Sequence, residues 1–238
     1  MKKLIIFLFV NFLSVFSIVL HAQEDVTKFL GIPVDGSKSE MIQKLKAKGF
    51  TNTSSEKDIL EGEFNGRNVI ITIATNGNKV YRIMVQDSYP VDEGSIKIRF
   101  NNLAQQFLNN KKYSPLFLIS NYILPEDENI SYELLINKKQ YQAVFWQRSV
   151  ADSALIEKEM QSVAWAKYAA EMLSRSDVLE KLSGLTEEVQ KFVITTQYLM
   201  EQNYLKKIVW FTISEDTGKY RITIFYDNKY NEANGEDL

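Results

Sequence analysis

The chain of 238 residues contains no cysteine and only one histidine, His21. Without a thiol it can form no disulfide, use no cysteine nucleophile and carry no lipid on a leader cysteine. A single imidazole also leaves no His/Cys zinc or haem site. If residue 21 is removed during maturation, Ser-His-Asp catalysis is excluded as well. These absences favour recognition over reaction.

The first 22 residues have the pattern of an export leader, and residues 1–22 are interpreted as a signal peptide. Lys2 and Lys3 form a charged start, residues 4–20 form an apolar run, and Ala22 is a small residue at the expected cleavage position. Cleavage after Ala22 leaves 216 of the 238 residues and changes the formal net charge from −2 to −4, because two lysines are lost. The alternative is an uncleaved signal anchor, since 17 residues approach the ~20 that span a bilayer.

We expect an exported protein, periplasmic or secreted, with no stable transmembrane segment once the leader is removed. No second apolar run of about 18 residues follows the leader. A nucleic-acid partner is not expected, because 28 basic residues face 30 acidic ones and phosphate backbones require a concentrated basic face. Arginine is scarce and scattered, at Arg67, Arg82, Arg99, Arg148, Arg175 and Arg221.

Residues 23–238 are predicted to form a single α+β domain, since about 216 residues bury enough surface for a core without disulfides or metals. In the first half, residues 27–34 form a strand or an extended lead-in. Ser37 and Glu40 then form a capping box, and Gly49 ends the helix. Strands follow at 59–64, 68–75 and 79–86, and Asn65-Gly66 predicts a tight hairpin. Apolar residues at helical spacing predict a second helix over 93–110.

The second half begins with an irregular stretch over 113–129 and a hairpin of residues 130–136 with 140–147. Helices are predicted at 152–173, 177–183 and 186–202, the last capped by Thr186 and with a strand as the alternative. A final hairpin pairs 208–214 with 219–227, and 228–238 form a polar, frayed tail. The predicted fold is therefore an antiparallel sheet built from hairpins, with helices packed on one face and a helical segment, 151–203, inserted between late strands.

The candidate binding residues follow from strand alternation in the final hairpin. If Val209 and Tyr226 point into the core, their neighbours Trp210 and Phe225 point outward. Together with residues of a central strand they predict a Trp/Phe/Arg surface of the kind enriched at binding hot spots. The predicted ligand-binding residues are Trp210, Phe225, Arg221, Arg82 and Met84. The alternative is that another element covers this face and makes it ordinary core.

Other candidate chemistry is weaker. Glu61 and Glu63 share a strand face and could form a carboxylate pair for glycoside hydrolysis. The favoured interpretation is a solvated edge beside the hairpin turn. The oxygen-rich run from Asp227 to Asp237 fails the spacing of a calcium loop. No glycine-rich phosphate loop or GxSxG motif is present. No cofactor, metal site or catalytic residue is therefore predicted.

Five short stretches resemble a known group of proteins: HAQ at residues 21–23, FLGIPVDG at 29–36, LKAKGF at 45–50, FYDN at 225–228 and NGEDL at 234–238. They are similar to a family of uncharacterised exported proteins from Bacteroides and relatives. The resemblance implies export from a Gram-negative cell and adds no catalytic residue. The helical stretch 151–203 lies outside it.

The leading hypothesis is a noncatalytic exported binding or interaction module that recognises a protein, peptide or glycan through a sheet face. One alternative is a carboxylate-based glycan hydrolase. A second is an inhibitor or regulator of a neighbouring exported protein.

Overall fold

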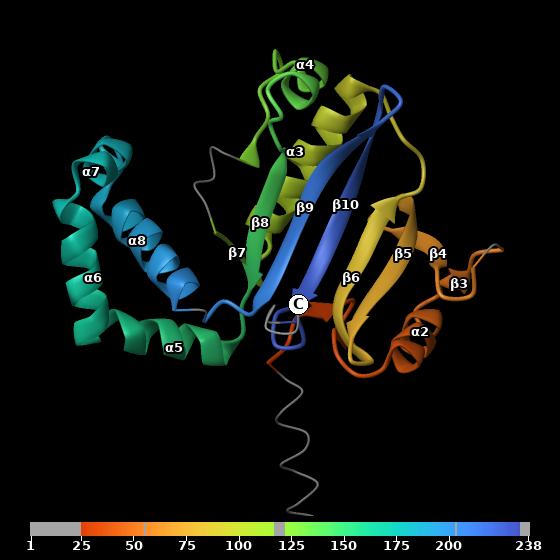
Figure 1. The fold of residues 1–238 in the computed structure, drawn as a ribbon, viewed down its shortest axis with the longest axis horizontal. Helices are drawn as coiled ribbons and strands as arrows, with labels where there is room; N and C mark the ends of the chain where they lie inside the picture. Colours follow the sequence, from red (N-terminus) through yellow and green to blue (C-terminus); the bar gives the residue numbers. More distant parts are fainter. Residues whose placement is uncertain (1–24, 55, 117–121, 203, 234–238) are drawn as a thin grey trace, which may run out of the picture.

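The computed structural model describes residues 25–54, 56–116, 122–202 and 204–233, so the predicted leader, residues 1–22, lies outside the described residues. The fold is α+β, as predicted, and its centre is an eight-stranded antiparallel sheet (Figure 1). The strands in spatial order are β3 (Thr51–Asn52), β4 (Leu60–Phe64), β5 (Arg67–Asn76), β6 (Lys79–Asp87), β10 (Lys219–Asn228), β9 (Lys207–Asp216), β8 (Gln142–Gln147) and β7 (Tyr113–Pro115).

The N-terminal half folds as local sequence signals predict. Residues 27–34 form a small hairpin of β1 (Lys28–Phe29) and β2 (Ile32–Pro33). Helix α2 (Lys38–Lys46) begins at Ser37 with the capping box to Glu40. The Asn65-Gly66 turn has φ values of 52° and 69°, which is the left-handed pair that a type I′ hairpin requires.

Helix α3 (Glu93–Asn109) covers one face of the sheet and completes the main core (Figure 1). Its buried stripe includes Ile96, Phe100, Leu103 and Phe107, at the spacing that the sequence predicts. The Phe100 ring packs edge-on against Phe211 of β9, with 4.9 Å between ring centroids. We call the sheet face that α3 covers the inner face and the opposite one the outward face.

The predicted hairpin of 130–136 with 140–147 is wrong. Ile130–Leu135 is a short helix, α4, whereas β8 pairs with β9 and β7. Asn129 caps α4 by accepting the Tyr132 N–H, and Glu93 of α3 accepts the N–H of Ile130 at 2.9 Å. These contacts satisfy backbone donors of the first turn, so a tertiary contact decides helix over strand.

The stretch predicted as irregular, 113–129, contains the edge strand β7. Its three residues pair with β8, from Tyr113 opposite Gln147 to Pro115 opposite Phe145. A proline is tolerated there because the outer edge of an edge strand needs no ladder hydrogen bond.

Residues 150–201 form a helical arm to one side of the sheet (Figure 1). The single helix predicted over 152–173 is two helices, α5 (Val150–Met160) and α6 (Val163–Ser174), because Ser162 caps a new helix by accepting the Trp165 N–H. Val163, the first residue of α6, is 87% exposed. Two further helices complete the arm: α7 (Ser176–Leu182), as predicted, and α8 (Glu187–Glu201), with the predicted Thr186 cap.

The arm is inserted between β8 and β9, which are neighbours in the sheet. It packs back on the sheet through an apolar cluster in which Tyr198 and Leu199 of α8 surround Trp146 of β8, together with Leu116 and Leu205. The insertion predicted over 151–203 therefore leaves the strand pairing intact.

The predicted frayed tail begins too early. Asn228 belongs to β10, is 1% exposed, and donates from Nδ2 to the Val34 carbonyl at 2.8 Å. Asn231 donates in the same way to Asp35 and to the Val80 carbonyl. These bonds fix the end of β10 and the residues after it to the β2–α2 region and to the start of β6. Residues 234–238 lie outside the described residues.

Candidate functional site

The outward face of the sheet carries most of the predicted binding residues. Alternation is as expected, since Val209, Phe211 and Ile213 of β9 are buried on the inner face. Strand register places Met84, Phe225, Trp210 and Val144 in one row across β6, β10, β9 and β8. All four side chains are partly exposed. No described helix or strand crosses the middle of this face (Figure 1).

Trp210 and Phe225 form the centre of that row. They are cross-strand partners, and their rings stack with 3.9 Å between centroids and 9° between planes. The Trp210 Nε1–H donates to Asp227 Oδ2 at 2.9 Å. The pair is therefore held in one orientation by stacking and by a charge-assisted hydrogen bond.

Arg82 fixes the other side of this cluster. Its guanidinium donates twice to Asp227, from Nε at 2.6 Å and from Nη2 at 2.8 Å, and Asp227 is 2% exposed. Its Cζ lies 5.7 Å from the Trp210 ring centroid and 5.3 Å from that of Phe225. Hydrogen bonding of the Arg82 guanidinium to the Asp227 carboxylate is the main cause that raises the pKa of Arg82. The cation is thus permanent and preorganised beside the rings.

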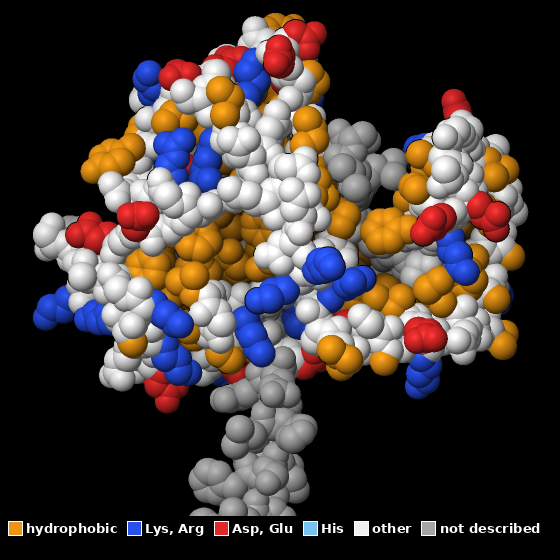
Figure 2. Space-filling view, turned by 180° about the vertical axis from the view of Figure 1, so that it is seen from behind, with side chains coloured by type: hydrophobic (Ala, Val, Ile, Leu, Met, Phe, Trp, Pro, Cys, Tyr) orange, Lys and Arg blue, Asp and Glu red, His pale blue; other side chains and the backbone are white. Residues whose placement is uncertain are grey.

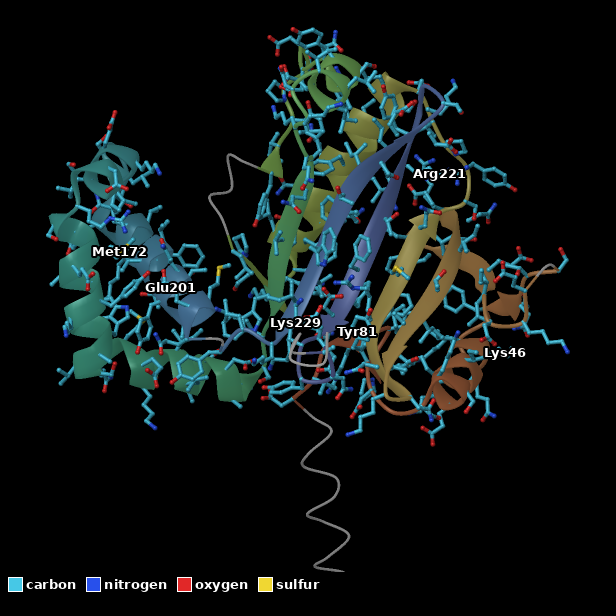
Figure 3. All side chains as sticks on the ribbon, viewed as in Figure 1. Lys46, Tyr81, Met172, Glu201, Arg221 and Lys229 are labelled. Carbon is cyan, nitrogen blue, oxygen red and sulfur yellow. The ribbon has the colours of Figure 1, made fainter. Side chains whose placement is uncertain are left out.

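Arg221 does not belong to this cluster, although the sequence grouped it there. It pairs with Ser214, four residues along β10 from Phe225. Figure 3 shows it toward the upper end of the sheet, whereas Tyr81, the neighbour of Arg82, lies lower. Its Nη2 is 3.9 Å from Asp216, and its buried Nε has no hydrogen-bond partner among the described residues. The structure brings together Trp210, Phe225, Arg82 and Met84.

The carboxylate pair that the sequence raised lies on β4. Glu61 and Glu63 are both exposed, opposite Ile70 and Asn68. This is the environment of a solvated strand beside a turn. Among the described residues, no three acidic, histidine or cysteine side chains are grouped so that they could hold a metal ion.

A cavity on the inner face was missed by sequence reasoning. It has a volume of about 1110 Å³ and lies beside the C-terminal half of α3. Figure 2 shows this hollow with hydrophobic side chains at its floor and Lys and Arg side chains along its lower rim. The aromatic lining residues are Phe50, Phe64, Phe107, Tyr113 and Tyr226, and the basic ones are Lys28, Lys48, Lys112, Arg148 and Lys207. These residues come from distant segments, so no local pattern could have indicated the site.

The rim of the cavity is organised by Gln147 of β8. Its amide clamps the backbone of Lys28, accepting the N–H at 2.6 Å and donating to the carbonyl at 3.0 Å. The same amide donates to the Tyr113 hydroxyl at 3.1 Å. The next residue, Arg148, donates its backbone N–H to the Lys112 carbonyl at 2.9 Å. These bonds fix the backbone at Lys28, Lys112 and Arg148, three basic residues that line the cavity.

Two tyrosines line the cavity, of which Tyr113 is partly exposed and Tyr226 is buried. Burial raises the pKa of Tyr113, partly offset by the hydrogen bond from Gln147, and burial raises the pKa of Tyr226 well above its ordinary value. Tyr226 is 4% exposed, packs on Phe29 at 4.8 Å, and its hydroxyl has no hydrogen-bond partner within the described ranges. Both phenols remain neutral donors at physiological pH.

One lysine of the lining, Lys207, already has its charge balanced by two ion pairs. Lys207 is 3% exposed, and its Nζ lies 2.5 Å from Asp25 and 2.5 Å from Asp152 of α5. By contrast, Lys28, Lys48, Lys112 and Arg148 form no ion pair with any described residue.

Comparison with known proteins gives no relative: no protein-family model, curated protein or solved structure matches this chain. Within the described ranges, no helix has the length and apolar character needed to cross a membrane.

Proposed function

We propose that this protein is an exported, noncatalytic binding module that engages a partner protein or peptide through the outward sheet face. One observation carries the proposal: the Trp210–Phe225 stack, held by Arg82 and Asp227, lies in the middle of the outward face, which no described helix or strand crosses. The arm covers this face only at its β8 side, through the cluster around Trp146. Tryptophan and arginine are the residues most enriched at binding hot spots. A cluster whose side chains are already fixed also loses little conformational entropy when a partner binds.

The geometry favours a peptide or protein over a glycan. Each ring covers one face of the other by stacking. Strand register places Met84 beside Phe225 and Val144 beside Trp210. A sugar ring requires an open aromatic face, whereas this row offers ring edges and aliphatic side chains. Such an apolar row suits the side chains of a protein segment.

The absence of reaction chemistry and the leader pattern support the remaining parts of the proposal. The only imidazole, His21, lies within the proposed leader, and the chain contains no thiol. Mass spectrometry of the protein from the cell envelope is expected to find Gln23 at the N-terminus. An intact Met1 terminus would contradict the proposed maturation.

The binding proposal is tested by screening the purified protein against a soluble peptide library and a glycan array. Trp210→Ala is expected to weaken peptide binding at least tenfold, since it removes the centre of the row. Tyr89→Ala is the matched control, because Tyr89 is 70% exposed and lies outside the row. The proposal fails if all ligands found bind the folded Trp210→Ala protein as tightly as the native one. If the screens find only glycan ligands, the proposed peptide or protein ligand is wrong and the ligand is a glycan.

A further inference from the structure

We infer that the cavity beside α3 is a second ligand site, which takes a single-chain amphiphile with an anionic head group, such as a fatty carboxylate. The site is on the inner face, opposite Trp210, and the inference therefore stands independently of the proposed peptide site.

The floor of the cavity suits an apolar chain. Phe107 and Phe50 line it and are 7% and 4% exposed, so their rings are embedded in the core and offer only their outer surface. Phe107 packs edge-on against Tyr113, with centroids 4.7 Å apart, which makes a continuous aromatic surface. Protein interiors are normally close-packed, and ligand pockets span roughly 300–1,000 Å³. A hollow of about 1110 Å³ is therefore large enough for an extended hydrocarbon chain.

The rim suits an anionic head group. Lys28, Lys112 and Arg148 all line the cavity, and none of them pairs with a described carboxylate. Gln147 binds the Lys28 backbone, and the backbone N–H of Arg148 donates to the Lys112 carbonyl. Glu63 is the only acidic residue among those that line the cavity. Several cations beside an apolar surface attract an anion and disfavour a cation of the same shape.

Tyr226 adds a hydrogen-bond donor to the site. It lines the cavity, and no described residue hydrogen-bonds to its hydroxyl. The hydroxyl is therefore available to donate to an acceptor of a bound ligand. This observation is independent of the charge of the rim.

The first test is calorimetric titration of the purified protein with three probes below their aggregation concentrations. Dodecanoate is expected to bind with a Kd of about 1–100 µM. Dodecyltrimethylammonium, with the same chain and the opposite charge, and acetate, with the same head group and no chain, are expected to bind at least tenfold more weakly. Equal binding of the cationic amphiphile would exclude the role of the rim, and equal binding of acetate would exclude the role of the floor. Absence of dodecanoate binding up to about 1 mM would overturn the inference.

Variants locate the binding. Arg148→Glu and Lys112→Glu change exposed side chains, and each is expected to weaken dodecanoate at least fivefold, whereas Lys79→Glu is the matched control at an exposed hairpin end. Gln106→Trp places a large ring into the cavity from the exposed side of α3 and is expected to abolish binding. Tyr226→Phe is expected to weaken it about two- to tenfold through loss of one hydrogen bond.

The inference is overturned if the charge reversals match Lys79→Glu and Gln106→Trp still binds. Trp210→Ala is expected to bind dodecanoate normally. If Trp210→Ala loses dodecanoate binding while Gln106→Trp binds normally, the amphiphile binds on the outward face, and the proposed site beside α3 is wrong.

Discussion

Lys207 shows how one buried charge connects three parts of the chain. It begins β9, and its ammonium contacts Asp25 at the start of the described chain and Asp152 in the first turn of the arm. Asp152 is 6% exposed and also accepts the Ser149 backbone N–H in its capping box. A buried carboxylate in such a position depends on its cation, because desolvation of an unpaired charge costs several kcal/mol.

Replacement of Lys207 by methionine is expected to lower the free energy of unfolding by about 3–5 kcal/mol, because Asp152 then remains as an unpaired buried charge. The measurement is urea unfolding at pH 7. The double variant Lys207→Met, Asp152→Asn is expected to recover part of the loss, since it leaves no buried charge. Lys79→Met serves as the surface control, and a loss below about 1 kcal/mol for the single variant would refute the assignment.

At the scale of elements, α4 is held in place by a residue of α3. Glu93 accepts the backbone N–H of Ile130 at 2.9 Å and the Ser131 hydroxyl at 2.6 Å. The hydrogen bond from Ser131 is the main cause that lowers the pKa of Glu93 below its ordinary 4.5. The charged carboxylate therefore stabilises the folded state above that pH, and this contribution is lost as the pH falls through the lowered value.

Glu93→Gln is expected to cost about 1–2 kcal/mol at pH 7, because a neutral amide replaces a carboxylate that accepts several hydrogen bonds. The difference between the variant and the native protein is expected to be smaller at pH 3 than at pH 7, because the contribution of the charged carboxylate falls as the pH falls towards the lowered pKa of Glu93. Urea unfolding at the two pH values measures it. Glu157→Gln, at an exposed position of α5, controls for the general loss of an acidic group. A difference that is the same at both pH values would contradict the role of the charge.

Elements with local start and stop signals were predictable, and those without them were not. Ser37 with Glu40, Thr186 and the Asn65-Gly66 turn mark their own boundaries, and the structure has an element end at each. The segment 130–136 alternates apolar and polar residues like a strand, but Glu93, 37 residues away, satisfies its first N–H groups. The sequence analysis also missed the break between α5 and α6 at Ser162, because apolar residues continue at helical spacing on both sides of this N-cap.

At the scale of the whole molecule, the arm is a separable insertion. The strands on either side of it pair directly, with Trp146 opposite Ile208. The arm contacts the sheet through the cluster around Trp146 and through the Asp152–Lys207 ion pair. The sheet and α3 retain their own core without it.

Replacement of residues 149–206 by a short glycine-containing turn is expected to leave a folded sheet. Trp146→Thr and Lys207→Thr accompany the deletion, because both side chains lose their cover. The free energy of unfolding is expected to fall by about 3 kcal/mol, comparable to burial of one or two large apolar side chains. Far-UV circular dichroism and urea unfolding measure the result. Loss of a single cooperative transition would show that the arm is part of the fold.

The sequence by itself determined the α+β class, the antiparallel hairpins and the alternation that turns Trp210 and Phe225 outward. It could do so because hydrophobic period, capping and turn chemistry act over a few residues. Only the tertiary structure decided that Arg82 joins those rings while Arg221 does not, that α4 is a helix, and that basic residues gather around an aromatic cavity. Those features depend on strand register and on contacts between distant segments, and such contacts produce no periodic pattern in the sequence.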